Sequence, residues 1–253
     1  MLSINWGTFL YLLLLLVPVI YLQRYLQREI QAIFLLITRQ PEISMALFSL
    51  LFLPGVLLHE TSHFLMAHLL GVRTGRFSII PKKLEGGRLQ LGYVETASSD
   101  FFRDALIGVA PLVMGGIFVA LVGVYRLGLN TVWGSLIQGQ MNTINLSIKS
   151  MIDRPDFWLW FYLTFAVGST MMPSTSDRRA WLPLIFVLVI LLVSILLIGV
   201  GPWLLSRFGN AFKAALDAIT MVFGITVMIH LILLPPMWII RKIISRLVGF
   251  QVV

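Results

Sequence analysis

Two histidines four residues apart enclose a glutamate in the segment His59-Glu60-Thr61-Ser62-His63. On an α-helix, residues four apart lie on one face about a turn from each other, so both imidazoles can direct a nitrogen at one ion. A carboxylate beside a zinc-bound water, whose pKa the metal lowers towards about 7, can take its proton and return it to a leaving amine. The segment therefore predicts a Zn²⁺ site with ligands His59 and His63, and Glu60 as the catalytic base of amide hydrolysis.

The alternative is a chance match or a structural polar cluster. The segment lies inside a long apolar run, where an ionisable side chain near the centre of a spanning helix costs about 2.5–3.5 kcal/mol by insertion scales. Three such residues within five positions need compensation, and a metal ion supplies it. The metal site is therefore the favoured interpretation.

A third protein ligand is expected, because catalytic zinc usually has three and keeps one position open for water. The chain has no cysteine, so this ligand must be His, Asp or Glu. His68 follows His63 by five residues and points away from the pair at 100° per residue. His230 stands alone in the last apolar run and suits a packed or water-facing residue. Glu95 is an alternative, and Asp177 is the preferred ligand.

Asp177 is preferred because the second and fourth apolar runs both end on the same expected side of the membrane. The alternative is an ordinary loop carboxylate paired with Arg178 or Arg179. The two sites differ in depth, since His63 precedes the end of its run by nine residues, about 13 Å of helix. Either the second span protrudes, or the chain unwinds at Pro173 and dips back beside a wet cavity.

The composition requires a bilayer as solvent. Hydrophobic residues make up 58% of the 253 and charged residues 12%, against roughly 25% charged in a soluble domain. Six apolar runs are candidates to cross a hydrocarbon layer of about 30 Å. They cover residues 8–22, 43–72, 105–129, 157–172, 180–205 and 212–240. We expect an all-α polytopic membrane protein with about six transmembrane helices.

Two intervening segments have a different character. Residues 24–39 have apolar positions at helical spacing, which fits a helix lying in the interface or a solvated linker. Residues 73–104 are rich in glycine and alternate in polarity, which predicts a small β-hairpin-like loop after the second helix. Pro54-Gly55, one turn before the motif, is expected to kink its helix.

The net charge of +8 comes from 19 Lys and Arg that cluster at the ends of apolar runs. They indicate topology and contact with anionic lipid head groups, and no nucleic-acid partner is expected. Counting them by loop gives 11 on the side of the amino terminus and 8 on the other, which favours both termini in the cytoplasm of a multi-pass protein of the cell (plasma) membrane. The run 8–22 lacks the features of a cleaved signal and is expected to remain.

Taken together, these residues resemble the site-2 protease family of intramembrane zinc metalloproteases. The resemblance rests on the motif within a spanning helix, the glycine-rich loop, the stretch Gly108-Val109-Ala110-Pro111-Leu112, and a later helix leading to Pro173 and Asp177. It covers roughly residues 43–181, which we expect to form the catalytic core, with 1–42 before it as the first helix and interfacial segment, and 182–253 after it as two further helices and a basic tail.

The resemblance implies roles for this chain. His59, His63 and Asp177 would bind zinc, Glu60 would activate water, and residues 73–97, including Gly92, Tyr93 and Val94, would hold an extended substrate segment by strand-edge hydrogen bonds. The substrate would be a membrane protein or transmembrane peptide. The chain lacks the family's Asn before the Pro and its Gly after the Asp, so it would be a divergent member.

Two other functions remain open. A non-catalytic metal-binding scaffold or transporter would have a closed four-ligand site. A membrane zinc protease that cuts soluble loops would have the same ligands and a different substrate. The oligomeric state is not predicted.

Overall fold

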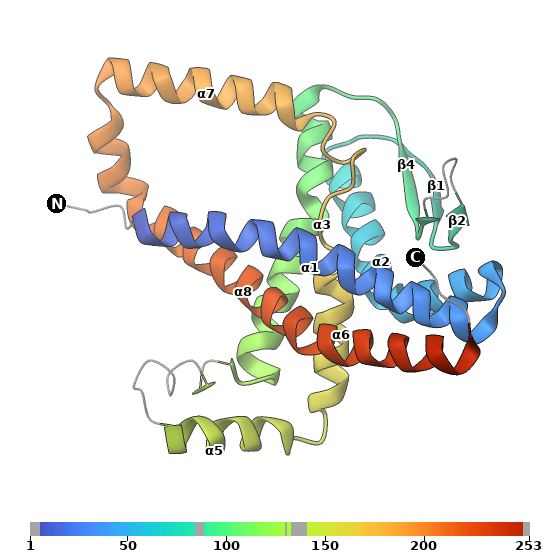
Figure 1. Cartoon of the computed structure of the whole chain (residues 1–253). Coiled ribbons are helices and arrows are strands. Elements are labelled where there is room, and N and C mark those ends of the chain that lie inside the picture. The colour runs from blue at the N-terminus through green and yellow to red at the C-terminus, as the bar shows by residue number, and fades with distance from the viewer. Residues whose placement is uncertain (1–5, 84–88, 130, 133–140, 250–253) are drawn as a thin grey trace.

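The computed structural model describes residues 6–83, 89–129, 131–132 and 141–249. It is mostly helical, with a small β-structure after the second helix (Figure 1). In chain order the elements are α1 (Trp6–Thr38), α2 (Pro41–Leu69), β1 (Thr74–Ser78), β2 (Lys82–Lys83), β3 (Leu89–Gln90), β4 (Tyr93–Thr96), α3 (Phe101–Leu121), the π-helical η2 (Val122–Arg126), α5 (Met141–Ile152), α6 (Phe157–Gly168), α7 (Trp181–Ile198) and α8 (Gly201–Val248).

Five of these helical stretches are long and apolar enough to cross a membrane, namely α1, α2, α3 with η2, α7 and α8. This confirms a multi-pass membrane protein. Two details of the prediction were wrong. The run 8–22 and the segment 24–39 form one helix, α1, because no helix-breaking residue separates them. The run 157–172 is helical only as α6, whose 12 residues are fewer than the roughly 20 that a complete span needs.

The predicted glycine-rich hairpin is present as two short antiparallel strand pairs. Strand β1 pairs with β4, with Phe77 opposite Val94 and Ser78 opposite Tyr93. Within this pair, β2 pairs with β3. Because β4 leads directly into the loop before α3, the strands lie at the same end of α3 as the start of α7 (Figure 1).

The apolar core joins helices that are distant in sequence. One buried cluster draws residues from α1, α2, α3, α6 and α8, including Leu26, Phe52, Val119 and Phe165. Helix α2 also keeps Pro54 inside one continuous helix. In contrast, α7 has no buried residue and extends away from the other helices (Figure 1). Helices α1 and α8 pack against each other, and α2, α3 and α6, which surround the candidate site, pack against this pair.

The chain after α6 continues beside α3 without forming a helix. Phe157, at the start of α6, packs near Val122, whereas Asp177 lies against Gly108. Gly108 of α3 and Val122 at the start of η2 are fourteen residues apart, about 21 Å along the helix. The short helix and the segment after it together therefore cover most of the depth of a hydrocarbon layer of about 30 Å.

Candidate metal centre

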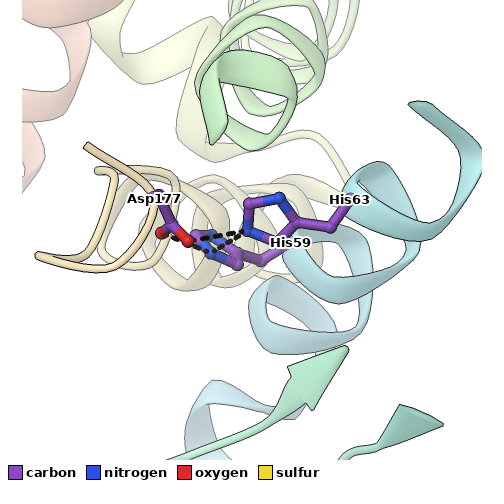
Figure 2. A group of neighbouring side chains, drawn as sticks. All are labelled: His59, His63 and Asp177. Carbon is purple, nitrogen blue, oxygen red and sulfur yellow. Dashed lines mark hydrogen bonds and ion pairs between the residues drawn. The ribbon is translucent and has the colours of Figure 1, made fainter. Parts of the chain in front are cut away.

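Three side chains from two distant parts of the chain converge on one point (Figure 2). His59 and His63 project from neighbouring turns of α2, and Asp177 reaches them from the connection between α6 and α7. The two Nε2 atoms are 3.2 Å apart. The Asp177 carboxylate oxygens lie 3.7 Å from His59 Nε2 and 3.4 Å from His63 Nε2. These residues form a group that could hold a metal ion.

The spacing of these atoms fits a zinc-sized ion. Bonds of about 2.0–2.2 Å in tetrahedral geometry place neighbouring ligand atoms about 3.3–3.6 Å apart, within about 0.1 Å of the separations of 3.2, 3.4 and 3.7 Å between the three groups. Two imidazole nitrogens that face each other also repel unless a proton or a cation lies between them. The donor set of two imidazoles and a carboxylate is one that zinc accepts in catalytic sites.

His63 is oriented by a hydrogen bond to the neighbouring helix. Its Nδ1 lies 2.8 Å from the carbonyl oxygen of Ile107 on α3. Because a carbonyl can only accept, Nδ1 carries the proton, and the neutral ring then has its Nε2 lone pair free for the centre. His59 Nδ1 is buried and has no hydrogen-bond partner in the part of the chain that the structure describes. His63 is therefore the more firmly held of the two imidazoles.

Asp177 is held in a tight turn outside any regular element. The Ser174 N–H donates to Asp177 Oδ2 at 2.7 Å, and the Asp177 N–H donates to the Ser174 hydroxyl at 3.3 Å. Its two oxygens face the two imidazoles, at 3.7 Å from His59 Nε2 and 3.4 Å from His63 Nε2. In its carboxylate form, the side chain could bind a cation there.

The unwound segment resolves the difference in depth between the two ligand sets. Unwinding begins at Ser169, earlier than the expected Pro173, because α6 ends at Gly168. The chain then follows α3 until Asp177 lies against Gly108, next to the Ile107 carbonyl that orients His63. Adjacent residues of α3 thus contact both ligand sets.

Glu60 lies beside the metal group and under the β-hairpin. The residue is 7% exposed. It is close enough to interact electrostatically with all three candidate ligands. A Cβ atom on Gly92 would lie 2.8 Å from Glu60 Cγ and 2.9 Å from Val56 Cγ1, so the loop backbone rests directly on this face of α2. The absence of a side chain at position 92 makes that contact possible.

Tyr93 and Val94 continue from Gly92 as the start of β4. They pair with Ser78 and Phe77 of β1, so one edge of β4 is used. In the ranges that the structure describes, no strand pairs with the opposite edge of β4. The segment predicted to bind the substrate, Gly92 to Val94, therefore begins next to Glu60. Among the described residues, no strand pairs with its second edge.

The other residues considered as ligands lie elsewhere. His68 is exposed and stacks on Phe64. His230 is buried against α6, and Glu95 accepts a hydrogen bond from the Arg76 N–H within the sheet. Arg178 contacts the Ser174 carbonyl, and the ion pairs seen for Asp177 in the described residues are with the two histidines.

Sequence reasoning missed the residues that support the ligands. The Ile107 carbonyl and Ser174 have no signature, because a backbone acceptor and a turn serine are common everywhere. Gly108 did have a sequence signature, since it begins the stretch Gly108-Val109-Ala110-Pro111-Leu112 on which the family resemblance partly rests. Its contact with Asp177, however, could be found only in three dimensions.

Comparison of the chain with family models, with curated proteins and with solved structures found no significant match. The fold and the site together define a multi-pass membrane protein with a candidate His-His-Asp metal centre. Function must therefore be argued from the centre itself.

Proposed function

We propose that this protein is a zinc-dependent intramembrane protease, similar to the site-2 protease family, that hydrolyses a peptide bond in or near a transmembrane segment. The observation that carries the proposal is the arrangement of Glu60 beside a three-residue group of His59, His63 and Asp177. Three protein ligands leave a tetrahedral ion one position for water, as catalytic zinc sites require.

Each residue of the centre has a defined role in this proposal. His59, His63 and Asp177 hold the ion, which when bound polarises a water molecule and the substrate carbonyl. Glu60 accepts the proton of the attacking water and passes it to the leaving amine. Its burial keeps bulk water from competing for that proton.

The hairpin would hold the substrate. The free edge of β4 offers backbone donors and acceptors to an extended peptide, and this edge begins at Gly92, beside Glu60. A transmembrane helix must unwind before it can be cut, because its backbone groups are otherwise paired within the helix. A strand edge replaces the hydrogen bonds that such unwinding breaks.

The depth of the site favours a membrane-embedded substrate. His63 lies six residues before the end of the membrane-spanning helix α2, which is about 9 Å of helix. A soluble-loop substrate would have to enter the apolar region to reach this level. Mapping the cleaved bond in a test substrate distinguishes the two kinds of protease.

The scaffold or transporter alternative requires a closed site. Such a site would have a fourth side chain in contact with the ion, and the group found among the described residues contains three. X-ray absorption at the zinc edge would count the ligands, and a bound water in the fourth position would favour the enzyme.

The decisive experiment replaces Glu60 by glutamine, which preserves the size of the side chain. Purified wild-type protein should contain about one zinc and cleave a membrane-spanning test substrate. Glu60→Gln should retain the zinc and lose cleavage by at least about 100-fold, because general-base catalysis contributes about 10²–10⁴-fold. Glu42→Gln, at an exposed position of the same helix, is the matched control. Undiminished cleavage in Glu60→Gln would refute the assigned role.

The orientation with both termini in the cytoplasm is part of the proposal. The chain has no cysteine, so a single cysteine added at either end can be labelled without background. A reagent that cannot cross the membrane should leave both ends unlabelled in intact cells and label both after the membrane is permeabilised. That result would support this orientation.

A further inference from the structure

Ser169 is the point where the ligand-bearing segment leaves α6, and its environment is polar although it is buried. It is 1% exposed. The last carbonyls of a helix have no partner within the helix, and a bilayer has no water to supply one. Here two glutamines of α1 supply it, since the amide groups of Gln23 and Gln27 both donate to the Ser169 carbonyl. The two glutamines are four residues apart and so lie on one face of α1.

The side chain of Ser169 is bound from the opposite helix. His230 Nδ1 lies 2.7 Å from the Thr226 carbonyl and its Nε2 lies 3.0 Å from the Ser169 hydroxyl. The carbonyl can only accept, so Nδ1 carries the proton of the neutral ring and Nε2 accepts from the hydroxyl. We call the set Gln23, Gln27, Ser169 and His230 the Ser169 clamp. It connects α1, the end of α6 and α8 in one hydrogen-bonded network.

The clamp is followed within eight residues by the metal ligand. Met171 is buried against α3. A Cβ atom added to Gly115 of α3 would lie 2.6 Å from the Cβ atom of Met171. Asp177 then packs its backbone on Gly108. The segment therefore has a fixed start at Ser169, a contact of Met171 with Gly115 two residues later, and a fixed end where Asp177 meets Gly108. Because it is not helical, these contacts take the place of the hydrogen-bond ladder that would otherwise set its register.

We propose that Gln23, Gln27 and His230 are positioning residues for Asp177, and that they act by fixing Ser169, the start of the segment that carries this ligand. The inference rests on the proposed metal centre and does not require protease activity. None of the three touches the candidate ligands. Their effect is geometric, because a metal centre needs its ligands held within about 0.5 Å of the productive position.

The test measures metal affinity of the full-length protein in detergent, using Zn²⁺ against a competing chelator. In Gln23→Leu/Gln27→Leu, the Ser169 carbonyl loses both donors. Affinity should fall about 10–100-fold, the range seen when supporting partners of metal ligands are removed. Replacing zinc by Co²⁺ gives a second readout, because its visible absorption reports ligand geometry. The spectrum should change in the variant even when the metal is saturating.

The matched control disturbs a different contact between α1 and α8. Glu29 is buried and its Oε2 lies 2.5 Å from Arg241 Nε, without touching the clamp. Glu29→Gln should loosen the same pair of helices, yet leave zinc affinity within about twofold and the Co²⁺ spectrum unchanged. Equal losses of zinc affinity in Glu29→Gln and in Gln23→Leu/Gln27→Leu would overturn the positioning role. No loss in Gln23→Leu/Gln27→Leu would overturn it as well.

A gentler pair of variants covers the case in which the double variant does not fold. Ser169→Ala removes only the hydroxyl that donates a hydrogen bond to His230, whereas Ser169→Thr retains a hydroxyl at this position. The first should weaken Zn²⁺ binding and alter the Co²⁺ spectrum, and the second should restore both. Identical behaviour of the two would contradict the proposal. If the wild-type protein bound no Zn²⁺ or Co²⁺, the metal centre itself would fail, and its positioning with it.

Discussion

The backbone of Asp177 passes so close to Gly108 that a Cβ atom at position 108 would overlap the Asp177 carbonyl oxygen. This contact joins the unwound segment after α6 to the helix that orients His63 through the Ile107 carbonyl. The two candidate ligand sets therefore share one support, and the position of the third ligand depends on a residue that contributes no side chain.

Gly108→Ala should weaken metal binding. The added methyl group has to displace the Asp177 backbone, since neither that backbone nor α3 is a flexible side-chain end. We expect the affinity for Zn²⁺ to fall about 10–100-fold, as for the loss of a supporting partner, measured by chelator competition. Gly116→Ala on the same helix is the control, because its Cβ would meet only Val222 at 3.9 Å. Equal affinities in the two variants would show that the close approach has no effect on the ligand.

Asp177→Asn should remove the metal while preserving the shape of the turn. An amide lacks the negative charge of a carboxylate and binds zinc more weakly, so the loss should exceed the roughly 100-fold upper range for outer-shell residues. Zinc content by mass spectrometry measures it. Asp153→Asn, at an exposed position distant in sequence, should retain about one zinc. A zinc content unchanged in Asp177→Asn would assign the third ligand elsewhere.

Gly92→Ala should impair cleavage without removing the metal. The methyl group would press on Glu60 Cγ and Val56 Cγ1 and move either the base or the substrate strand. A displacement of about 1 Å in an active site can cost about 100-fold in rate, so we expect a 10–100-fold loss of turnover with normal zinc content. Gly75→Ala is the control, since its methyl group would meet the side chain of Glu95 and not Glu60 or a candidate ligand. Loss of zinc in Gly92→Ala would instead indicate a general disturbance of α2.

The start of α3 should show a pH dependence that is independent of the metal. Hydrogen bonding from the Arg103 N–H, together with the nearby guanidinium and the Phe102 N–H, lowers the pKa of Asp100, the N-cap of α3. A lowered pKa in the folded state means that the ionised form stabilises the fold above the unfolded pKa of about 3.9. This stability is lost as the pH falls through the folded value.

Asp100→Asn tests that dependence, because asparagine keeps a capping oxygen and loses the charge. The melting temperature of wild-type protein should exceed that of the variant by a few degrees at most at pH 7, and the difference should vanish towards pH 2–3. Thermal unfolding in detergent, with the metal removed, measures it. A difference that persists unchanged at low pH would exclude the charge as its source.

The sequence by itself determined the features that are local in the chain. Apolar runs predicted the long helices, alternation and glycines predicted the hairpin, and the four-residue spacing placed His59 and His63 on one face of α2. Each of these follows from the helical or strand period, which a short stretch of sequence contains in full. The continuous helix α1 over residues 6–38 and the early end of α6 did not follow, since hydropathy does not mark where a helix stops.

Only the tertiary structure decided how Asp177 reaches the histidines. Its position depends on backbone packing against Gly108 and on hydrogen bonds that Ser169 receives from residues more than 140 positions earlier in the chain. Such contacts have no period and leave only a glycine or a serine in the sequence. The sequence could therefore favour Asp177 as the third ligand, whereas the packing of α1, α3, α6 and α8 brings its carboxylate within 3.7 Å of both imidazoles.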